Sequence, residues 1–261
     1  PAPDVAAPAG SAPSAPAGQA PHRLSPRERR LAAERAATSA NGGEPASGPA
    51  ATAAPDRFRE LIAAKTLESW QTIPHFALTR QLDAEPLLAV HAGARVRFGA
   101  QITITDLLLR AVALALPGEQ PADVALAVAT PRGVLNPVIP DVRAHDLPAL
   151  AELRAAAVQR ARDGRLNAAD VAPATTTLSN LGTAGVDHFT GIVTPGQTTL
   201  LTLGTIAPRV VADGDAVVVR RTLYATLNAD HRALDGADAA ALLGAFAAAL
   251  ADGTALTEAV A

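Results

Sequence analysis

The composition of the chain changes abruptly near residue 55, and this change limits where a folded core can form. Residues 1–21 are almost entirely Ala, Pro, Gly and Ser, and residues 39–55 have a similar composition. Such segments bury too little apolar surface to offset the entropy lost on ordering, and proline keeps them extended. We therefore expect disordered linkers at 1–21 and 39–55 and one folded domain over 56–261, which is long enough to bury a sizeable core.

A short charged stretch, 22–38, separates the two linkers and has the pattern of a helix. Ser25 can cap free backbone N–H groups, and Pro26 suits the first helical turn. Charge runs are usually solvated faces, so the pattern also fits a simple charged helix within a tail.

Beyond residue 56, helix-like and strand-like spacings of apolar residues alternate, which predicts an α/β domain. Helices are expected at 57–67, where Phe58, Leu61, Ile62 and Leu67 share a face, at 107–116 after a Thr105 cap, at 147–162 between an Asp146 cap and Gly164, and at 236–250. Strand-like runs are expected around Ile102 and Ile104, at 124–129, 134–139, 199–203 and 222–227, with a hairpin turn at Asp213-Gly214.

Charge and composition exclude several classes of function. The formal net charge is −3, which gives no basic footprint for nucleic acid, and no apolar run is long enough to span a bilayer. With no cysteine there is no disulfide, thiolate metal site or cysteine nucleophile. The four histidines His22, His91, His145 and His188 lack metal-ligand spacing, so no metal site is expected. Without a signal-peptide pattern, the expected location is the cytoplasm.

The sequence DHRALDG at 230–236 places His231 between a strand-like run and a helix-like run. A neutral imidazole titrates near physiological pH, so it can take a proton from a thiol or hydroxyl and return it within one turnover. A purely structural role is the alternative. In that case Asp235 is only the N-cap of the following helix, with Asp238 favouring the helix's positive end.

Further motifs precede DHRALDG in a fixed order. They are IPHF at 73–76, TITD at 103–106, TPRGVLNPVI at 130–139, TLSNLG at 177–182 and FTGIVTP at 189–195. Each motif is weak or moderate alone, but the series resembles the catalytic domain of the acyltransferase component of 2-oxo acid dehydrogenase complexes, over about residues 56–261. His75 matches a family position without an evident role, and we expect it to serve packing or hydrogen bonding.

The resemblance implies a fold and a chemistry. The fold would be the two-layer, mixed-sheet α/β domain of coenzyme A-dependent acyltransferases, similar to chloramphenicol acetyltransferase. The reaction would exchange an acyl group between the thiols of dihydrolipoamide and coenzyme A. His231 would be the general base, Ser179 of a neighbouring subunit the oxyanion donor, and Asp235, where the family accepts Asn or Asp, would organise the histidine loop.

The resemblance also implies partners. The family forms homotrimers, often joined into larger cores, that act on lipoyl domains and bind dehydrogenase subunits. Lys65 is the only lysine and lies in a helix-like stretch, so the lipoyl group must come from a separate domain or chain. The 22–38 helix resembles only part of the family's peripheral subunit-binding domain. Acetyl, succinyl and branched-chain donors all remain open.

Two departures from the family pattern keep other functions in view. Residues 118–123 replace a longer segment, which could reshape an edge of the sheet or the substrate channel, and Pro173-Ala174 replaces a glycine pair. The alternatives are a free-standing acyltransferase with another acceptor and a trimeric scaffold without turnover.

Overall fold

The computed structural model describes residues 57–118 and 120–258, apart from the side chains of Arg57 and Phe58. These residues belong to one unit that begins at Pro55. The linkers expected at 1–21 and 39–55, and the helix expected at 22–38, lie outside the described residues.

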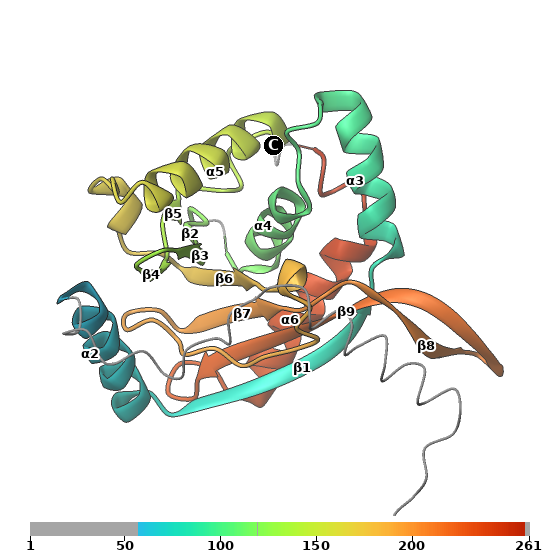
Figure 1. Cartoon of the computed structure of the whole chain (residues 1–261). Helices are drawn as coiled ribbons and strands as arrows, with labels where there is room; N and C mark the ends of the chain where they lie inside the picture. Colours follow the sequence, from blue (N-terminus) through green and yellow to red (C-terminus); the bar gives the residue numbers. More distant parts are fainter. Residues whose placement is uncertain (1–56, 119, 259–261) are drawn as a thin grey trace, which may run out of the picture. The chain divides into compact units, whose positions relative to one another are not determined.

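A seven-stranded sheet forms the centre of the domain (Figure 1). Its order is β1-β9-β7-β6-β2-β5, and β8 pairs with the outer part of β9. Strand β6 runs parallel to β2 and β7, and every other pairing is antiparallel, so the sheet is mixed, as predicted. The strands are β1 His75–Asp83, β2 Val124–Leu126, β5 Val138–Ile139, β6 Thr176–Asn180, β7 Thr199–Leu203, β8 Ala207–Asp213 and β9 Ala216–Asp230.

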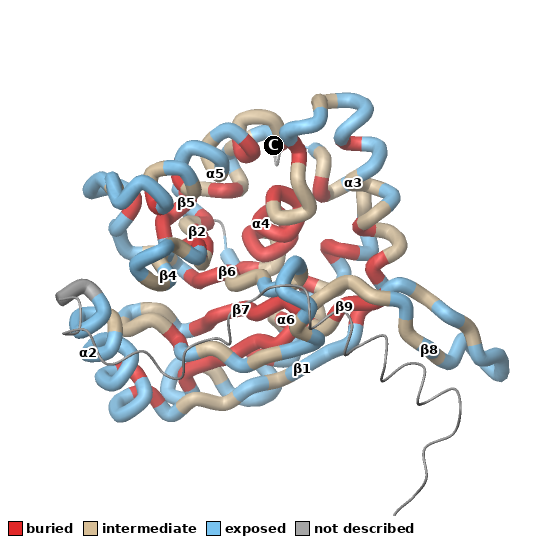
Figure 2. The backbone as a smooth tube through the Cα atoms, in the orientation of Figure 1, coloured by how far each residue is buried: buried red, intermediate tan, exposed pale blue. Residues whose placement is uncertain are grey.

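Four helices share one hydrophobic core with this sheet. They are α3 Glu85–Phe98, α4 Ile104–Ala115, α5 Leu147–Arg162 and α6 Gly236–Ala251. Leu107 of α4, Leu178 of β6 and Phe246 of α6 are all at most 2% exposed within this core. The buried residues lie between the sheet and the helices (Figure 2), which gives the predicted two layers.

Helix α4 is the most buried helix, and its start differs from the prediction. Its N-cap is Thr103, not Thr105. Asp106 accepts both the backbone N–H and the hydroxyl of Thr103 at 2.7 Å, and Arg154 of α5 donates to the same carboxylate at 2.8 and 3.0 Å. Because these bonds fix the first turn at Thr103, Ile104 lies in the helix instead of a strand.

The two strands expected at 124–129 and 134–139 are each broken. Their outer parts, β2 and β5, remain in the main sheet, whereas β3 Val128–Thr130 and β4 Gly133–Leu135 form a separate hairpin. Gly133 has φ +130°, and the Thr130 hydroxyl donates to its carbonyl oxygen at 2.7 Å. Pro137 lacks an N–H for strand pairing, which separates β4 from β5.

The short connection after α4 is fastened by one side chain. Arg143 donates to the carbonyl oxygens of Gly118 and Gln120 at 2.7 and 2.9 Å, and also to those of Ala113 and Leu116 near the end of α4. Five guanidinium donors can serve several free carbonyls at once. Arg143 therefore satisfies carbonyl groups both at the C-terminal end of α4 and in the connection that follows it.

Helix α2, Arg57–Thr72, extends the predicted helix by five residues but packs less than expected. Leu61 and Leu67 are 58% and 55% exposed, and Trp70 is 66% exposed. Three other predicted features are confirmed: Asp146 caps α5, Gly164 with φ +67° follows its end, and β8 and β9 form the hairpin at Asp213-Gly214.

Candidate active site

Ser179 lies near the C-terminal end of β6 and is half-buried. It lines an open cleft of about 860 Å³, together with residues of α3, α4, α5 and the β2–β3 connection. Its hydroxyl forms no hydrogen bond with any other residue that the structure describes. A hydroxyl without an internal partner is available to donate to a ligand in the cleft.

His231 follows the last residue of β9 and is exposed. Its backbone N–H donates to the Pro74 carbonyl oxygen at 3.0 Å, and its ring lies against that of Phe76 with centroids 4.6 Å apart. The Arg232 guanidinium bonds to Asp230 and lowers the pKa of that carboxyl. The loop is therefore held at its backbone, while the imidazole remains accessible.

Asp235 begins α6 and serves as its N-cap. Its Oδ1 accepts the backbone N–H groups of Ala237 and Asp238 at 2.7 and 2.9 Å, and Asp238 accepts the N–H of Asp235 at 3.1 Å in return. These backbone bonds, first that of Asp238, lower the pKa of the Asp235 carboxyl, and the charge of His231 contributes in the same direction. The capping role is confirmed, and the carboxylate also interacts with the histidine.

Ser179 and His231 do not meet within one chain. The register pairs Ser179 with Thr202 and Thr202 with Thr226, two strands away, and His231 lies five residues beyond Thr226. With a rise of about 3.3 Å per residue and strands about 4.8 Å apart, this places the two residues roughly 19 Å from each other. A reaction that uses both side chains therefore requires a second copy.

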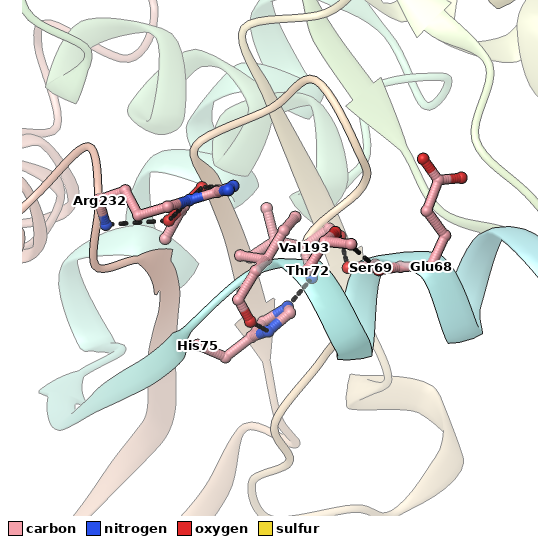
Figure 3. Close-up of polar contacts among 8 residues, drawn as sticks. Glu68, Ser69, Thr72, His75, Val193 and Arg232 are labelled. Carbon is pink, nitrogen blue, oxygen red and sulfur yellow. Dashed lines mark hydrogen bonds and ion pairs between the residues drawn. The ribbon is translucent and has the colours of Figure 1, made fainter.

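His75 makes the hydrogen bonds expected of a structural histidine. Its Nε2 accepts the Val193 backbone N–H at 3.0 Å, and its Nδ1 lies 2.8 Å from the Ile73 carbonyl oxygen (Figure 3). The Ser69 hydroxyl donates to the Val193 carbonyl oxygen at 2.5 Å. The segment containing Val193 is thereby joined to the end of α2 and the start of β1.

Sequence reasoning missed the arginines of the cleft. Arg95 of α3 and Arg154 and Arg162 of α5 line it, and His91 stands beside them. The available signal was the basic residues in the last turns of α3 and α5, but nothing in the sequence brings these helices together. Among the described residues, no group of three or more His, Cys, Asp or Glu side chains could hold a metal ion.

The family model of the 2-oxoacid dehydrogenases acyltransferase (catalytic domain) matches residues 49–118 and 118–257. The chain belongs to this family. The match is divided at residue 118, where the connection after α4 is short. The acyltransferase resemblance that the sequence indicated is therefore confirmed.

Curated members of the family show moderate identity. The dihydrolipoyllysine-residue acetyltransferase components of the pyruvate dehydrogenase complexes of Rickettsia conorii and Zymomonas mobilis are 30% identical over 201 residues and 31% over 202 residues. Each alignment covers 70% of this chain, and it covers 49% and 46% of the two relatives, respectively. The chain thus spans about half the length of the curated relatives it matches.

Solved structures of the family confirm the predicted fold. Azotobacter vinelandii dihydrolipoamide acetyltransferase has a TM-score of 0.74 at 27% identity, covering 82% of this chain and 98% of that one. The cubic core of a pyruvate dehydrogenase multienzyme complex has a TM-score of 0.73, also at 27% identity, with the same coverage.

Proposed function

We propose that the protein transfers an acyl group between the thiols of dihydrolipoamide and coenzyme A in a 2-oxo acid dehydrogenase complex. One observation carries the proposal. The Azotobacter structure comes from an investigation of the role of a serine, a histidine and an asparagine in that enzyme's catalytic mechanism. The serine and histidine there are 52 positions apart and the asparagine follows by four, which are the intervals between Ser179, His231 and Asp235.

His231 acts as the general base in this proposal. Its imidazole takes the proton of the attacking thiol, and the sulfur then forms a bond to the carbonyl carbon of the acyl thioester. A thiol with a pKa near 8.5 needs only modest help to become the much better nucleophile, the thiolate. When the intermediate collapses, the carbon–sulfur bond to the first carrier breaks, and the leaving thiolate takes the proton back from the imidazolium.

Ser179 stabilises the negative charge that develops on the carbonyl oxygen. Its hydroxyl has no internal partner among the described residues, so it can donate to the oxyanion without breaking an existing bond. One well-placed donor contributes about 3 kcal/mol in comparable acyl-transfer sites. Asp235 caps α6 directly after the histidine loop and so helps to organise this loop. The investigation of the Azotobacter protein names an asparagine at the matching interval.

The separation of roughly 19 Å supports a site shared by two copies. We propose a homotrimer in which each active site combines His231 of one subunit with Ser179 of its neighbour. The similarity to the cubic core of a pyruvate dehydrogenase complex supports the further proposal that such trimers join into a larger assembly. In this arrangement an isolated subunit has no complete site.

The cleft beside Ser179 suits coenzyme A. Arg95 and Arg162 line it and form no ion pair with other described residues, so they can meet the phosphates of the nucleotide, whereas Arg154 is already bonded to Asp106. Lys65 lies on helix α2, so we propose that a lipoyl domain elsewhere supplies the second thiol.

The wider organisation follows the family. We propose a catalytic domain at 56–261, preceded by the linkers at 1–21 and 39–55 and by a 22–38 helix that resembles only part of the family's peripheral subunit-binding domain. No helix among the described residues is long and apolar enough to cross a bilayer. A cytoplasmic location is part of the same proposal.

Acyl transfer from acetyl-, succinyl- and isobutyryl-coenzyme A to free dihydrolipoamide tests this function. The wild type and His231→Ala are compared at a concentration where the trimer has been verified. We expect turnover with at least one donor and its collapse in the variant while the trimer persists. A folded trimer without turnover on any donor would contradict the proposal and favour a scaffold or another acceptor.

A further inference from the structure

The start of β1 touches the histidine loop on both sides of His75. The Pro74 carbonyl oxygen accepts the backbone N–H of His231 at 3.0 Å, and the Phe76 ring packs against the His231 ring with centroids 4.6 Å apart. These are the contacts that hold the proposed base from the β1 side. Because Pro74 and Phe76, the two neighbours of His75, both contact His231, the conformation of residues 74–76 influences the position of the His231 imidazole.

His75 is itself held at both ring nitrogens (Figure 3). Since Nε2 accepts the Val193 N–H, the proton of the neutral ring lies on Nδ1, which donates to the Ile73 carbonyl oxygen at 2.8 Å. The Trp70 ring stacks on His75 with centroids 5.9 Å apart. A ring fixed in this way has one tautomer and one orientation.

The two hydrogen bonds act on different parts of the molecule. The Nδ1–H bond closes the turn from Ile73 to His75, and this turn aims the Pro74 carbonyl at His231. The Nε2 bond instead satisfies the N–H of Val193, which is fully buried in a small cluster with Ile73 and Leu200. Losing the Nε2 bond leaves a buried N–H unsatisfied, which lowers stability, whereas losing the Nδ1–H bond frees the turn that carries the Pro74 carbonyl.

We propose that His75 is a positioning residue for acyl transfer. Through the bond from its Nδ1–H to the Ile73 carbonyl, it holds Pro74 and Phe76 in the conformation that orients His231. The inference rests on the proposed function, because orientation matters only if His231 is the base. His75 itself touches no reacting atom.

Two conservative variants separate the two bonds. In His75→Asn, the side-chain NH₂ takes the place of Nδ1–H and can still donate to Ile73, but the acceptor for Val193 is lost. In His75→Gln, the longer side chain brings an oxygen to the Val193 N–H, but the donor to Ile73 is lost. His75→Ala removes both bonds.

We expect turnover and stability to respond to different variants. His75→Gln and His75→Ala lower kcat by about 10- to 100-fold while KM for coenzyme A changes by less than about twofold, since a displaced base impairs chemistry more than binding. His75→Asn keeps kcat within about twofold of the wild type but melts at a lower temperature. His188→Ala, which alters a histidine that contacts Tyr224, serves as the control and retains kcat.

The outcomes decide between the roles of His75. Unchanged kcat in His75→Ala within an intact trimer, or an equal loss of kcat in His75→Asn and His75→Ala, would overturn the inference. Nitrogen NMR of the histidine rings in the wild-type protein adds a test without variants, and a neutral ring protonated at Nε2 would also overturn it. If His231→Ala retained turnover, the proposed function would fail instead.

Discussion

Mixing two inactive variants tests whether the active site is shared between subunits. Ser179→Ala removes the oxyanion donor and His231→Ala removes the base, and each is made as a pure protein. The register places these side chains roughly 19 Å apart in one chain, whereas a base and an oxyanion donor that serve one carbonyl must each lie about 3 Å from reacting atoms. No side-chain rotation closes that gap.

The expected magnitudes follow from the geometry. Ser179→Ala alone loses about 10²- to 10³-fold in kcat, as for other oxyanion donors. When the variants are unfolded together and refolded at equal amounts, a site is complete only if the histidine comes from a Ser179→Ala subunit and the serine from a His231→Ala neighbour. With random assembly into closed rings, about one quarter of the sites meet this condition.

The assay measures transfer from the active acyl-coenzyme A donor to dihydrolipoamide before and after co-refolding. We expect the co-refolded mixture to recover about one quarter of wild-type turnover and to have the molecular mass of a trimer. Each variant refolded alone is the matched control and stays at or below about 1% of wild-type turnover. Absence of recovery in mixed trimers, shown to contain both variants by mass spectrometry, would refute the shared site.

Three further predictions concern stability. Asp235→Asn retains the Oδ1 acceptor for the start of α6 and should leave the free energy of unfolding nearly unchanged in urea titrations, whereas Asp235→Ala should lower it by about 1 kcal/mol; equal losses would contradict the capping role. Asp106→Ala should lower the same free energy by about 3 kcal/mol, because the carboxylate is fully buried and Arg154 loses its partner; a change near zero would contradict this. The Arg221 guanidinium, through its side-chain hydrogen bond, lowers the pKa of Glu85 from 4.5 to about 2. The interaction of ionised Glu85 with Arg221 therefore stabilises the folded protein above pH 4.5, and this stabilisation is lost as the pH falls towards 2. Glu85→Gln should therefore flatten the dependence of stability on pH in that range, and an unchanged slope would show that the pair contributes little.

Features set by neighbouring residues could be predicted from the sequence. The Asp235 cap with Asp238 and the Asp146 cap both depend on interactions within one helical turn. The hairpin at Asp213-Gly214 depends on a turn that its own residues favour. For each of these the deciding contact spans only a few positions, so the pattern alone was sufficient.

Features set by distant residues could not be predicted. The ion pair between Arg154 and Asp106, which supports the start of α4, spans 48 positions. The bond between His75 and Val193 spans 118 positions, and the separation of Ser179 from His231 depends on the register of three strands. The motifs identified the chemical groups, but only the fold shows that one chain keeps them apart.

Trp70 has a practical consequence for studying this protein. It is the only tryptophan in the sequence, it is 66% exposed, and it stacks on the ring of His75. Indole emission shifts to shorter wavelength when water is removed from around the ring. Any association that covers Trp70 will therefore change the intrinsic fluorescence, which reports such an association without an attached label.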